Sequence, residues 1–193
     1  MCIYEYENAL YNIPYKNLFE SGGIIMLKAI QDLFGKSENK GTELELQAFM
    51  EGETVSLKEV PDQVFSKKIL GKGVAIDPTT EELLSPIDGK VVAVMGRTRH
   101  SCCIRGDKGL EILLHIGVNT VEMNGDGFEM LVENDQEVKA GDPLIKFSAE
   151  KIKAAGHPLI SSMVVTEMGE YRHAVFKTGK EVKKGSSIAR LTL

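Results

Sequence analysis

From residue 42 onward the chain alternates short apolar runs with Gly, Pro and Asp, which recur roughly every 8–12 residues. Runs of this length that are rich in Val, Ile and Leu favour β-strands. The spacing predicts an all-β fold, a compact antiparallel β-sandwich or barrel with short helices. The runs that we interpret as strands are residues 43–50, 73–78, 89–96, 101–105, 110–117, 143–147, 162–167, 173–177 and 186–191.

This part of the chain also contains an internal sequence repeat, which we call the internal echo. Residues 136–147 (QEVKAGDPLIKF) and 180–191 (KEVKKGSSIARL) share the pattern EVKxG followed by an apolar run. Each copy predicts a turn that leads into a strand, so we expect a sandwich with duplicated halves. One short helix is predicted at residues 148–155, with Ser148 as its N-cap and Gly156 at its end.

Residues 1–41 differ from the rest and are predicted to form an N-terminal arm ahead of a domain at 42–193. The arm holds a short amphipathic helix pattern at residues 26–35 and a linker. Two interpretations stand for residues 1–25. They are either a disordered extension of the protein or a translated stretch upstream of a native start at Met26.

Composition narrows the classes of function. The 193 residues carry a net charge of −5, and no Lys/Arg cluster persists, which argues against a nucleic-acid partner. No apolar stretch approaches the length of a membrane span, so we expect weak or no membrane contact. Three cysteines, of which Cys102 and Cys103 are adjacent, predict reduced thiols and a cytoplasmic location, since no signal-peptide pattern opens the chain.

Two of the four histidines can be placed by the hairpin that they flank. The runs at 101–105 and 110–117 enclose Gly-Asp-Lys-Gly, a strong hairpin-turn motif. If the turn is centred between Asp107 and Lys108, His100 lies directly opposite His115. Opposed side chains in such a ladder have Cβ atoms about 4.5–5.5 Å apart.

This register also assigns the faces of the hairpin. The more apolar face is the better core face, so we expect both imidazoles to point outward from the core. The histidine face would carry Cys102, Ile104, Glu111 and Leu113. The opposite face would carry Cys103, Leu110, Ile112 and Leu114.

The residues alone leave three interpretations of the histidine pair open. The first is a stacked surface pair with no chemistry. The second is a metal site, but zinc usually takes three or four protein ligands and no HxH or HxxxD motif lies nearby. We therefore expect no metal, with His100 and His115 as at most incidental zinc ligands. The third is phosphoryl chemistry, in which one neutral imidazole accepts the group and the other donates a hydrogen bond to it.

Several separated motifs resemble one protein family. LLHIGVNTVEMNGDGFEMLVENDQEVKAGDPLI (113–145), VPDQVFSKKILGKGVAIDP (60–78), LLSPIDGKVVAV (83–94) and TRHS (98–101) are similar to segments of the glucose-class enzyme IIA of the bacterial phosphoenolpyruvate:sugar phosphotransferase system. The resemblance covers nearly all of residues 42–193. It implies an antiparallel β-sandwich with duplicated halves.

The resemblance also implies an activity, a phosphoryl relay without a cofactor. The phosphocarrier HPr would phosphorylate His115 at Nε2, and the group would pass to a cysteine of a IIB domain. His100 would hydrogen-bond the phosphoryl group, and Thr98 would support His100. The carbonyl of Gly117 would hold Nδ1–H of His115 and leave Nε2 available.

A partner-docking rim is implied as well. Asp62 would meet an arginine of HPr, with a simple turn residue as the alternative. Asn119 stands where the family commonly has Asp, which removes one carboxylate from the rim. The candidates for an apolar rim that excludes water are Val64, Phe65, Ile69 and Leu70, for each of which ordinary core packing is the alternative.

Two other classes of function are alternatives to relay. A regulatory protein whose partner binding follows its phosphorylation state is compatible with relay. The segments SPIDGKVVAV and EVKAGDPLI resemble parts of biotinyl or lipoyl carriers. Such carriers need an exposed Lys in a hairpin, and the candidate segment SSMVVTEM contains no Lys. Cys102, Cys103, His157 and His173 match no motif and are expected to be structural or surface residues.

Overall fold

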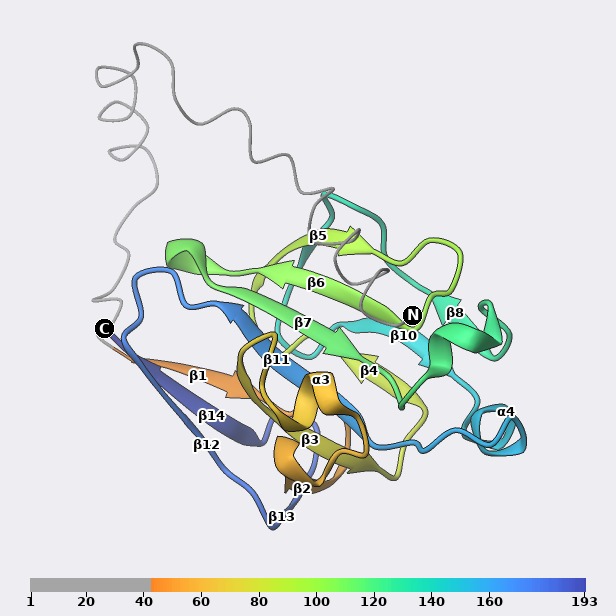
Figure 1. The fold of residues 1–193 in the computed structure, drawn as a ribbon. Coiled ribbons are helices and arrows are strands. Elements are labelled where there is room, and N and C mark those ends of the chain that lie inside the picture. Colours follow the sequence, from red (N-terminus) through yellow and green to blue (C-terminus); the bar gives the residue numbers. More distant parts are fainter. Residues whose placement is uncertain (1–42) are drawn as a thin grey trace.

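The computed structural model describes residues 43–193, and the predictions for residues 1–41 lie outside them. The described part consists of antiparallel strands and a few short helices (Figure 1). The strands are β1 (Glu43–Gln47), β2 (Gly52–Ser56), β3 (Lys72–Pro78), β4 (Glu82–Leu84), β5 (Gly89–Val94), β6 (Ser101–Arg105), β7 (Glu111–His115), β8 (Phe128–Met130), β9 (Glu137–Val138), β10 (Pro143–Phe147), β11 (Ser161–Glu167), β12 (His173–Phe176), β13 (Lys180–Val182) and β14 (Ser187–Thr192). The α-helices are α3 (Gln63–Ser66) and α4 (Ala149–Ala154), and the 3-10 turns are η1 (Leu57–Glu59), η2 (Asp107–Gly109) and η3 (Thr120–Met123).

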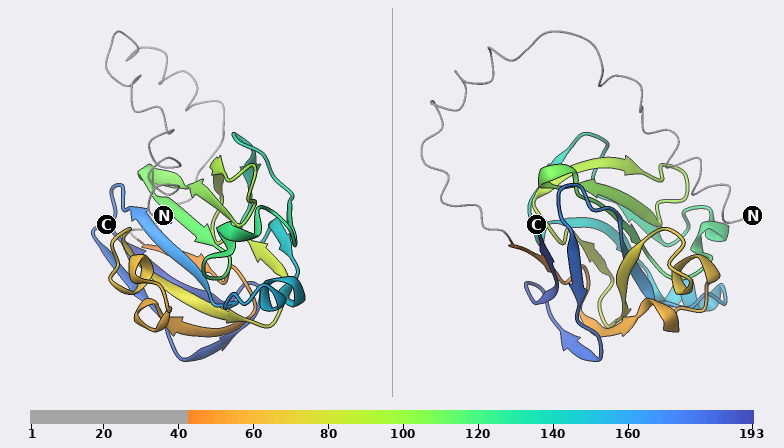
Figure 2. Two further views of the ribbon diagram at one scale, coloured as in Figure 1. Left: turned by 45° about the vertical axis from the view of Figure 1, so that its right-hand side comes forward. Right: turned by 60° about the vertical axis from the view of Figure 1, so that its left-hand side comes forward.

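The strands form one large sheet and two small ones, and Figure 2 shows them from two further directions. The large sheet has the order β13-β2-β3-β11-β7-β6-β5-β9. The small sheets have the orders β1-β14-β12 and β4-β10-β8. The predicted all-β antiparallel sandwich is therefore confirmed, and each of the nine runs predicted as strands overlaps one strand. The strands β2, β4, β8, β9 and β13 fall outside those runs.

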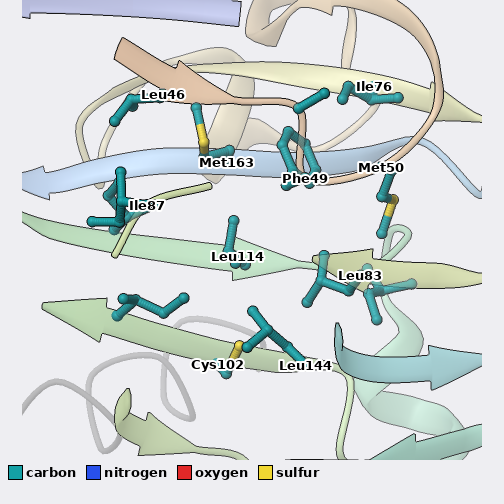
Figure 3. Packing of buried hydrophobic residues seen from close by; sticks show 14 of the residues in the cluster. Leu46, Phe49, Met50, Ile76, Leu83, Ile87, Cys102, Leu114, Leu144 and Met163 are labelled. Carbon is teal, nitrogen blue, oxygen red and sulfur yellow. The ribbon is translucent and has the colours of Figure 1, made fainter. Parts of the chain in front are cut away.

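The main core lies between the large sheet and the small sheets. Figure 3 shows Met163 of β11 pointing toward Leu46 of β1, with Leu114 of β7 between Met163 and the pair Cys102 of β6 and Leu144 of β10 in this view. All five side chains are buried in one hydrophobic cluster. Alternate residues of the central strands point into this core, which fixes the opposite set of residues on the outer face of the large sheet.

A second, smaller cluster covers part of that outer face. Its buried members come from η1 and α3, from the strands β3, β6, β7 and β11, and from the segments that follow η1 and β7. They are Leu57, Val60, Phe65, Ala75, Cys103, Leu113, Val118 and Val164. The α3 segment lies in front of the large sheet in Figure 1. Side chains on this face of β6, β7 and β11 are therefore enclosed by a second layer rather than open to solvent.

The internal echo of the sequence corresponds to a repeated structure. In one copy Asp142 N donates to Lys139 O, and in the other Ser186 N donates to Lys183 O. Gly141 and Gly185 take the same left-handed conformation, with φ of +86° and +84°. The strands β9 and β13 that precede the turns lie at opposite ends of the large sheet, and β10 and β14 that follow are each the middle strand of a small sheet. The two copies thus occupy matching places in the two halves.

The predicted helix at residues 148–155 is observed as α4. The Ser148 hydroxyl accepts a hydrogen bond from Lys151 N, and Gly156 follows the helix with φ of +81°. This is the expected N-cap and the expected glycine stop.

Candidate active site

The β6–β7 hairpin positions the first histidine, and its register differs by one residue from the prediction. Ser101, not His100, lies opposite His115. The reason is the length of the turn. Gly106 N donates to Leu110 O, so three residues rather than two form the loop, and Lys108 at its tip takes φ of +57°. A three-residue loop closed by a left-handed residue shifts every pair by one position.

This shift also corrects the predicted faces. Cys102 and Ile104 belong to the main core, whereas Cys103 belongs to the outer cluster. The prediction placed these three residues the other way round, because a one-residue slip moves a strand's side chains to opposite faces. The predicted faces of β7 do hold, because His115 shares its face with Leu113, and Leu113 lies in the outer cluster. The imidazole is nevertheless 2% exposed rather than displayed on the surface.

The two imidazoles meet despite the changed register. Their ring centroids are 4.7 Å apart, with the planes at 82°. Strict strand alternation would place His100 on the far side of the sheet from Ser101, but His100 precedes β6 and follows Arg99, whose φ is +55°. The left-handed Arg99 breaks the extended backbone at this point. The side chain of His100 can therefore turn toward His115, where it is buried.

Hydrogen bonding fixes the tautomer of His115. Its Nδ1 lies 2.9 Å from the carbonyl oxygen of Gly117. A carbonyl oxygen only accepts, so Nδ1 of the neutral ring carries the proton and Nε2 holds the lone pair. This is the arrangement in which Nε2 can act as a nucleophile.

The backbone of Gly117 is held at its N–H as well as at its carbonyl oxygen. Its N–H donates to Ser161 Oγ at 3.0 Å, and Ser161 Oγ donates to Leu159 O at 2.7 Å. Gly117 takes φ of +66°, and a Cβ at this position would lie 2.9 Å from Pro158 O. A side chain at residue 117 would therefore displace the carbonyl that orients His115.

Thr98 is the partner of the second imidazole. Nδ1 of His100 lies 2.9 Å from Thr98 Oγ1, and both residues are buried. When the threonine hydroxyl donates to Nδ1, the neutral ring carries its proton on Nε2. That tautomer gives His100 one N–H to donate to an anion beside it.

Burial keeps both imidazoles neutral. Burial lowers the pKa of His115 from 6.5 to about 4, and its hydrogen bond to the Gly117 carbonyl opposes part of this effect. Burial, with a smaller contribution from the nearby His115, also lowers the pKa of His100. Near neutral pH the site thus presents one neutral acceptor nitrogen and one neutral donor, not a cationic pair.

A cover for the site is provided by α3. The Phe65 ring lies 5.2 Å from the His115 ring, centroid to centroid, and is buried in the outer cluster. Asp62 is the N-cap of α3, since its Oδ1 accepts from Val64 N at 2.7 Å and Phe65 N at 3.4 Å. The cap begins the turn that places Phe65 over the imidazole.

The remaining rim candidates differ in exposure. Val64 is buried, Leu70 is half-buried and Ile69 is 65% exposed. Ile69 is thus the apolar side chain of the four that faces solvent. Asn119 is exposed and takes φ of +58° at the start of η3, a left-handed conformation that Asn tolerates better than most residues.

Two serines that the sequence analysis did not single out flank His115. Ser101 of β6 and Ser162 of β11 are both directly opposite His115, and both are buried. Ser162 lies 47 positions after His115 in the chain, so no local pattern pairs them; only the order β6-β7-β11 does.

The other chemistry-bearing residues lie apart from this site or are inert. Burial raises the pKa of both the Cys102 and Cys103 thiols. His173 is exposed and His157 is half-buried. Within residues 43–193, no cluster of three or more His, Cys, Asp or Glu is placed to hold a metal ion. In the same part of the chain, no helix is long and apolar enough to cross a membrane.

Known proteins are similar to this chain in both fold and sequence. Residues 44–171 match the family model described as phosphoenolpyruvate-dependent sugar phosphotransferase system, EIIA 1. The PTS system glucose-specific EIIA component of Staphylococcus epidermidis is 38% identical over 155 residues, which are 80% of this chain and 93% of that protein. The protein of the same description from Haemophilus influenzae is 37% identical over 81% of this chain and 93% of its own length. The structure of the glucose permease IIA from Mycoplasma capricolum superposes with a TM-score of 0.70 at 36% identity, covering 77% of this chain and 95% of that one.

A β-sandwich with these relatives is a phosphotransferase component. The chain belongs to the EIIA 1 family of the phosphoenolpyruvate-dependent sugar phosphotransferase system. Its role is phosphoryl relay in that system.

Proposed function

We propose that His115 carries the phosphoryl group in this relay, through Nε2. The observation that carries the proposal is the hydrogen bond from Nδ1–H to the Gly117 carbonyl, because it leaves Nε2 of a neutral ring as the nucleophilic nitrogen. The lowered pKa of His115 supports it, since a neutral imidazole is retained through the physiological range.

The chemistry is two successive transfers. In the first, Nε2 of His115 attacks the phosphorus of phospho-HPr, so a new N–P bond forms while the N–P bond of the HPr histidine breaks. In the second, a thiolate of a IIB-domain cysteine attacks the same phosphorus, and His115 leaves as a neutral imidazole. His100 Nε2–H would donate to the phosphoryl oxygens, with its Nδ1 held by Thr98.

Docking would use the rim around α3. Both helix-capping bonds of Asp62 use Oδ1, which leaves Oδ2 for an arginine of HPr. Exposed Ile69 and half-buried Leu70 would provide apolar contact, while Phe65 shields the imidazole from water. A cytoplasmic location follows from these partners and stays part of the proposal.

The carrier-module alternative has no support in the geometry. The segment SSMVVTEM, which would have to be an exposed hairpin, lies in β11 and its C-terminal end, and β11 is paired on both sides by β3 and β7. A phosphorylation-dependent regulatory role is compatible with the same site.

Incubation with phosphoenolpyruvate, enzyme I and HPr tests the proposal. We expect one acid-labile phosphate per chain, which His115→Ala abolishes. The matched control is His173→Gln, which removes an exposed histidine and should label fully. Stoichiometric labelling of His115→Ala would overturn the proposal.

A further inference from the structure

Ser162 stands out among the buried polar groups. Its hydroxyl is buried and makes no hydrogen bond within the part of the chain that the structure describes. Buried polar groups are hydrogen-bonded in the great majority of cases, so an exception calls for an explanation. The contrast with its neighbour is sharp, because Ser161 Oγ both donates to Leu159 O and accepts from Gly117 N.

The position of Ser162 relates it to the site. Ser162 lies directly opposite His115 in the β11–β7 pair. Two residues further along the same face of β11, Val164 belongs to the outer cluster, as does Leu113 two residues before His115. Both Ser162 and His115 therefore point to the outer side of the large sheet, where opposed side chains have Cβ atoms about 4.5–5.5 Å apart.

We propose that Ser162 binds the phosphoryl group on phospho-His115, by donating its hydroxyl hydrogen to a phosphoryl oxygen. A phosphoryl group brings three acceptor oxygens, and hydrogen bonds to charged acceptors are stronger than those between neutral groups. His100 approaches His115 at one edge, and Ser162 occupies the neighbouring strand on the other side of β7 from β6. The hydroxyl without a protein partner would thus find its acceptor when the protein is phosphorylated.

This inference rests on the proposed role of His115 and assigns a new residue to that site. It also predicts how substitutions at Ser162 and Ser161 change the stability of the unphosphorylated protein. Removal of a buried hydroxyl that has a partner destabilises a protein, whereas removal of one that has none does not. Ser162→Ala should therefore leave the unphosphorylated fold at least as stable as before, whereas Ser161→Ala should destabilise it.

The experiment uses the full chain and its Ser162→Ala, Ser162→Thr and Ser161→Ala variants. Each is phosphorylated with phosphoenolpyruvate, enzyme I and HPr, and the equilibrium ratio of phosphorylated chain to phospho-HPr is measured together with the urea midpoint. For Ser162→Ala we expect labelling that remains on His115, an equilibrium shifted toward phospho-HPr by about tenfold, and an unchanged or higher midpoint. Ser162→Thr keeps a hydroxyl at this position, so its ratio of phosphorylated chain to phospho-HPr should lie between those of Ser162→Ala and the unaltered chain.

Three results would contradict these expectations in different ways. An unchanged ratio in Ser162→Ala would overturn the inference while leaving His115 as the carrier. A lowered midpoint in Ser162→Ala would overturn it too, by showing that the hydroxyl has a structural role. Failure of the unaltered chain to label on His115 would instead overturn the proposed function on which the inference rests.

Discussion

The imidazole of His100 meets that of His115 edge-on at 4.7 Å, although the two residues are not partners in the β6–β7 ladder. The contact depends on the left-handed Arg99, which releases His100 from strand alternation. One ring is oriented by Gly117 and the other by Thr98, each through Nδ1. In both rings the oriented nitrogen is thus Nδ1, and the proposed phosphoryl chemistry is assigned to the Nε2 atoms.

Removal of the second imidazole should separate the two transfers. We expect His100→Ala to accept the phosphoryl group from phospho-HPr but to pass it to a IIB domain at least 100-fold more slowly, because loss of a preorganised donor to developing charge typically costs about 10²–10³ in rate. Rapid-quench measurement of each half-reaction checks this. Equal slowing of both half-reactions would show that His100 acts on the fold of the site rather than on onward transfer.

Stability should decline toward acid pH because of the buried imidazoles. Both have pKa values below the 6.5 of the unfolded chain, so below pH 6.5 the unfolded state binds protons that the folded state does not. The free energy of unfolding should fall as pH drops from 6.5 toward 4, by roughly 1 kcal/mol per pH unit for each histidine. Denaturant unfolding of His100→Gln should show a shallower decline; an identical pH profile would contradict burial of a neutral His100.

The ring of Phe65 should protect the phosphohistidine from water. In Phe65→Leu the aromatic cover over His115 shrinks, at a cost of about 1 kcal/mol in stability. We expect faster release of inorganic phosphate from the phosphorylated variant after removal of the donor. Phe147→Leu is the matched control, since it alters a buried ring of the main core instead. Equal release from both variants would show that Phe65 does not shield the site.

The rim charge at residue 119 should affect docking and not chemistry. Asn119 is exposed and left-handed, a conformation that Asp also tolerates. We expect Asn119→Asp to raise the association rate with phospho-HPr severalfold at low salt and little at high salt, with kcat unchanged. Asn134→Asp adds the same charge at another exposed position and controls for net charge. A salt-independent effect would contradict electrostatic docking.

The sequence predicted the parts of the fold that depend on local pattern. The apolar runs located nine of the fourteen strands of the described residues, Ser148 and Gly156 located α4, and the EVKxG repeat located two equivalent turns. Very short strands such as β9, Glu137–Val138, carry too few residues to show an alternation of their own. They form because neighbouring strands supply their hydrogen-bonding partners.

The structure brings together His100, His115, Thr98 and Gly117, which the sequence had named as candidates, but not in the geometry that the sequence predicted. Turn length decided the register, and a Gly-Asp-Lys-Gly motif does not distinguish a two-residue from a three-residue loop. The cap role of Asp62 was missed because α3 is a single turn with no periodicity. Ser162 was missed because its relation to His115 arises from the pairing of β11 with β7, which is a property of the whole sheet.

The assignment of Nε2 of His115 as the phosphoryl carrier is tested most directly by locating the phosphorus on a nitrogen atom. The chain would be produced with ¹⁵N-labelled histidine, phosphorylated with phosphoenolpyruvate, enzyme I and HPr, and examined by ³¹P–¹⁵N correlation. We expect a single coupling, to Nε2 of His115, with Nδ1 still protonated toward Gly117. A coupling to Nδ1 of His115, or to any nitrogen of His100, would contradict the assignment.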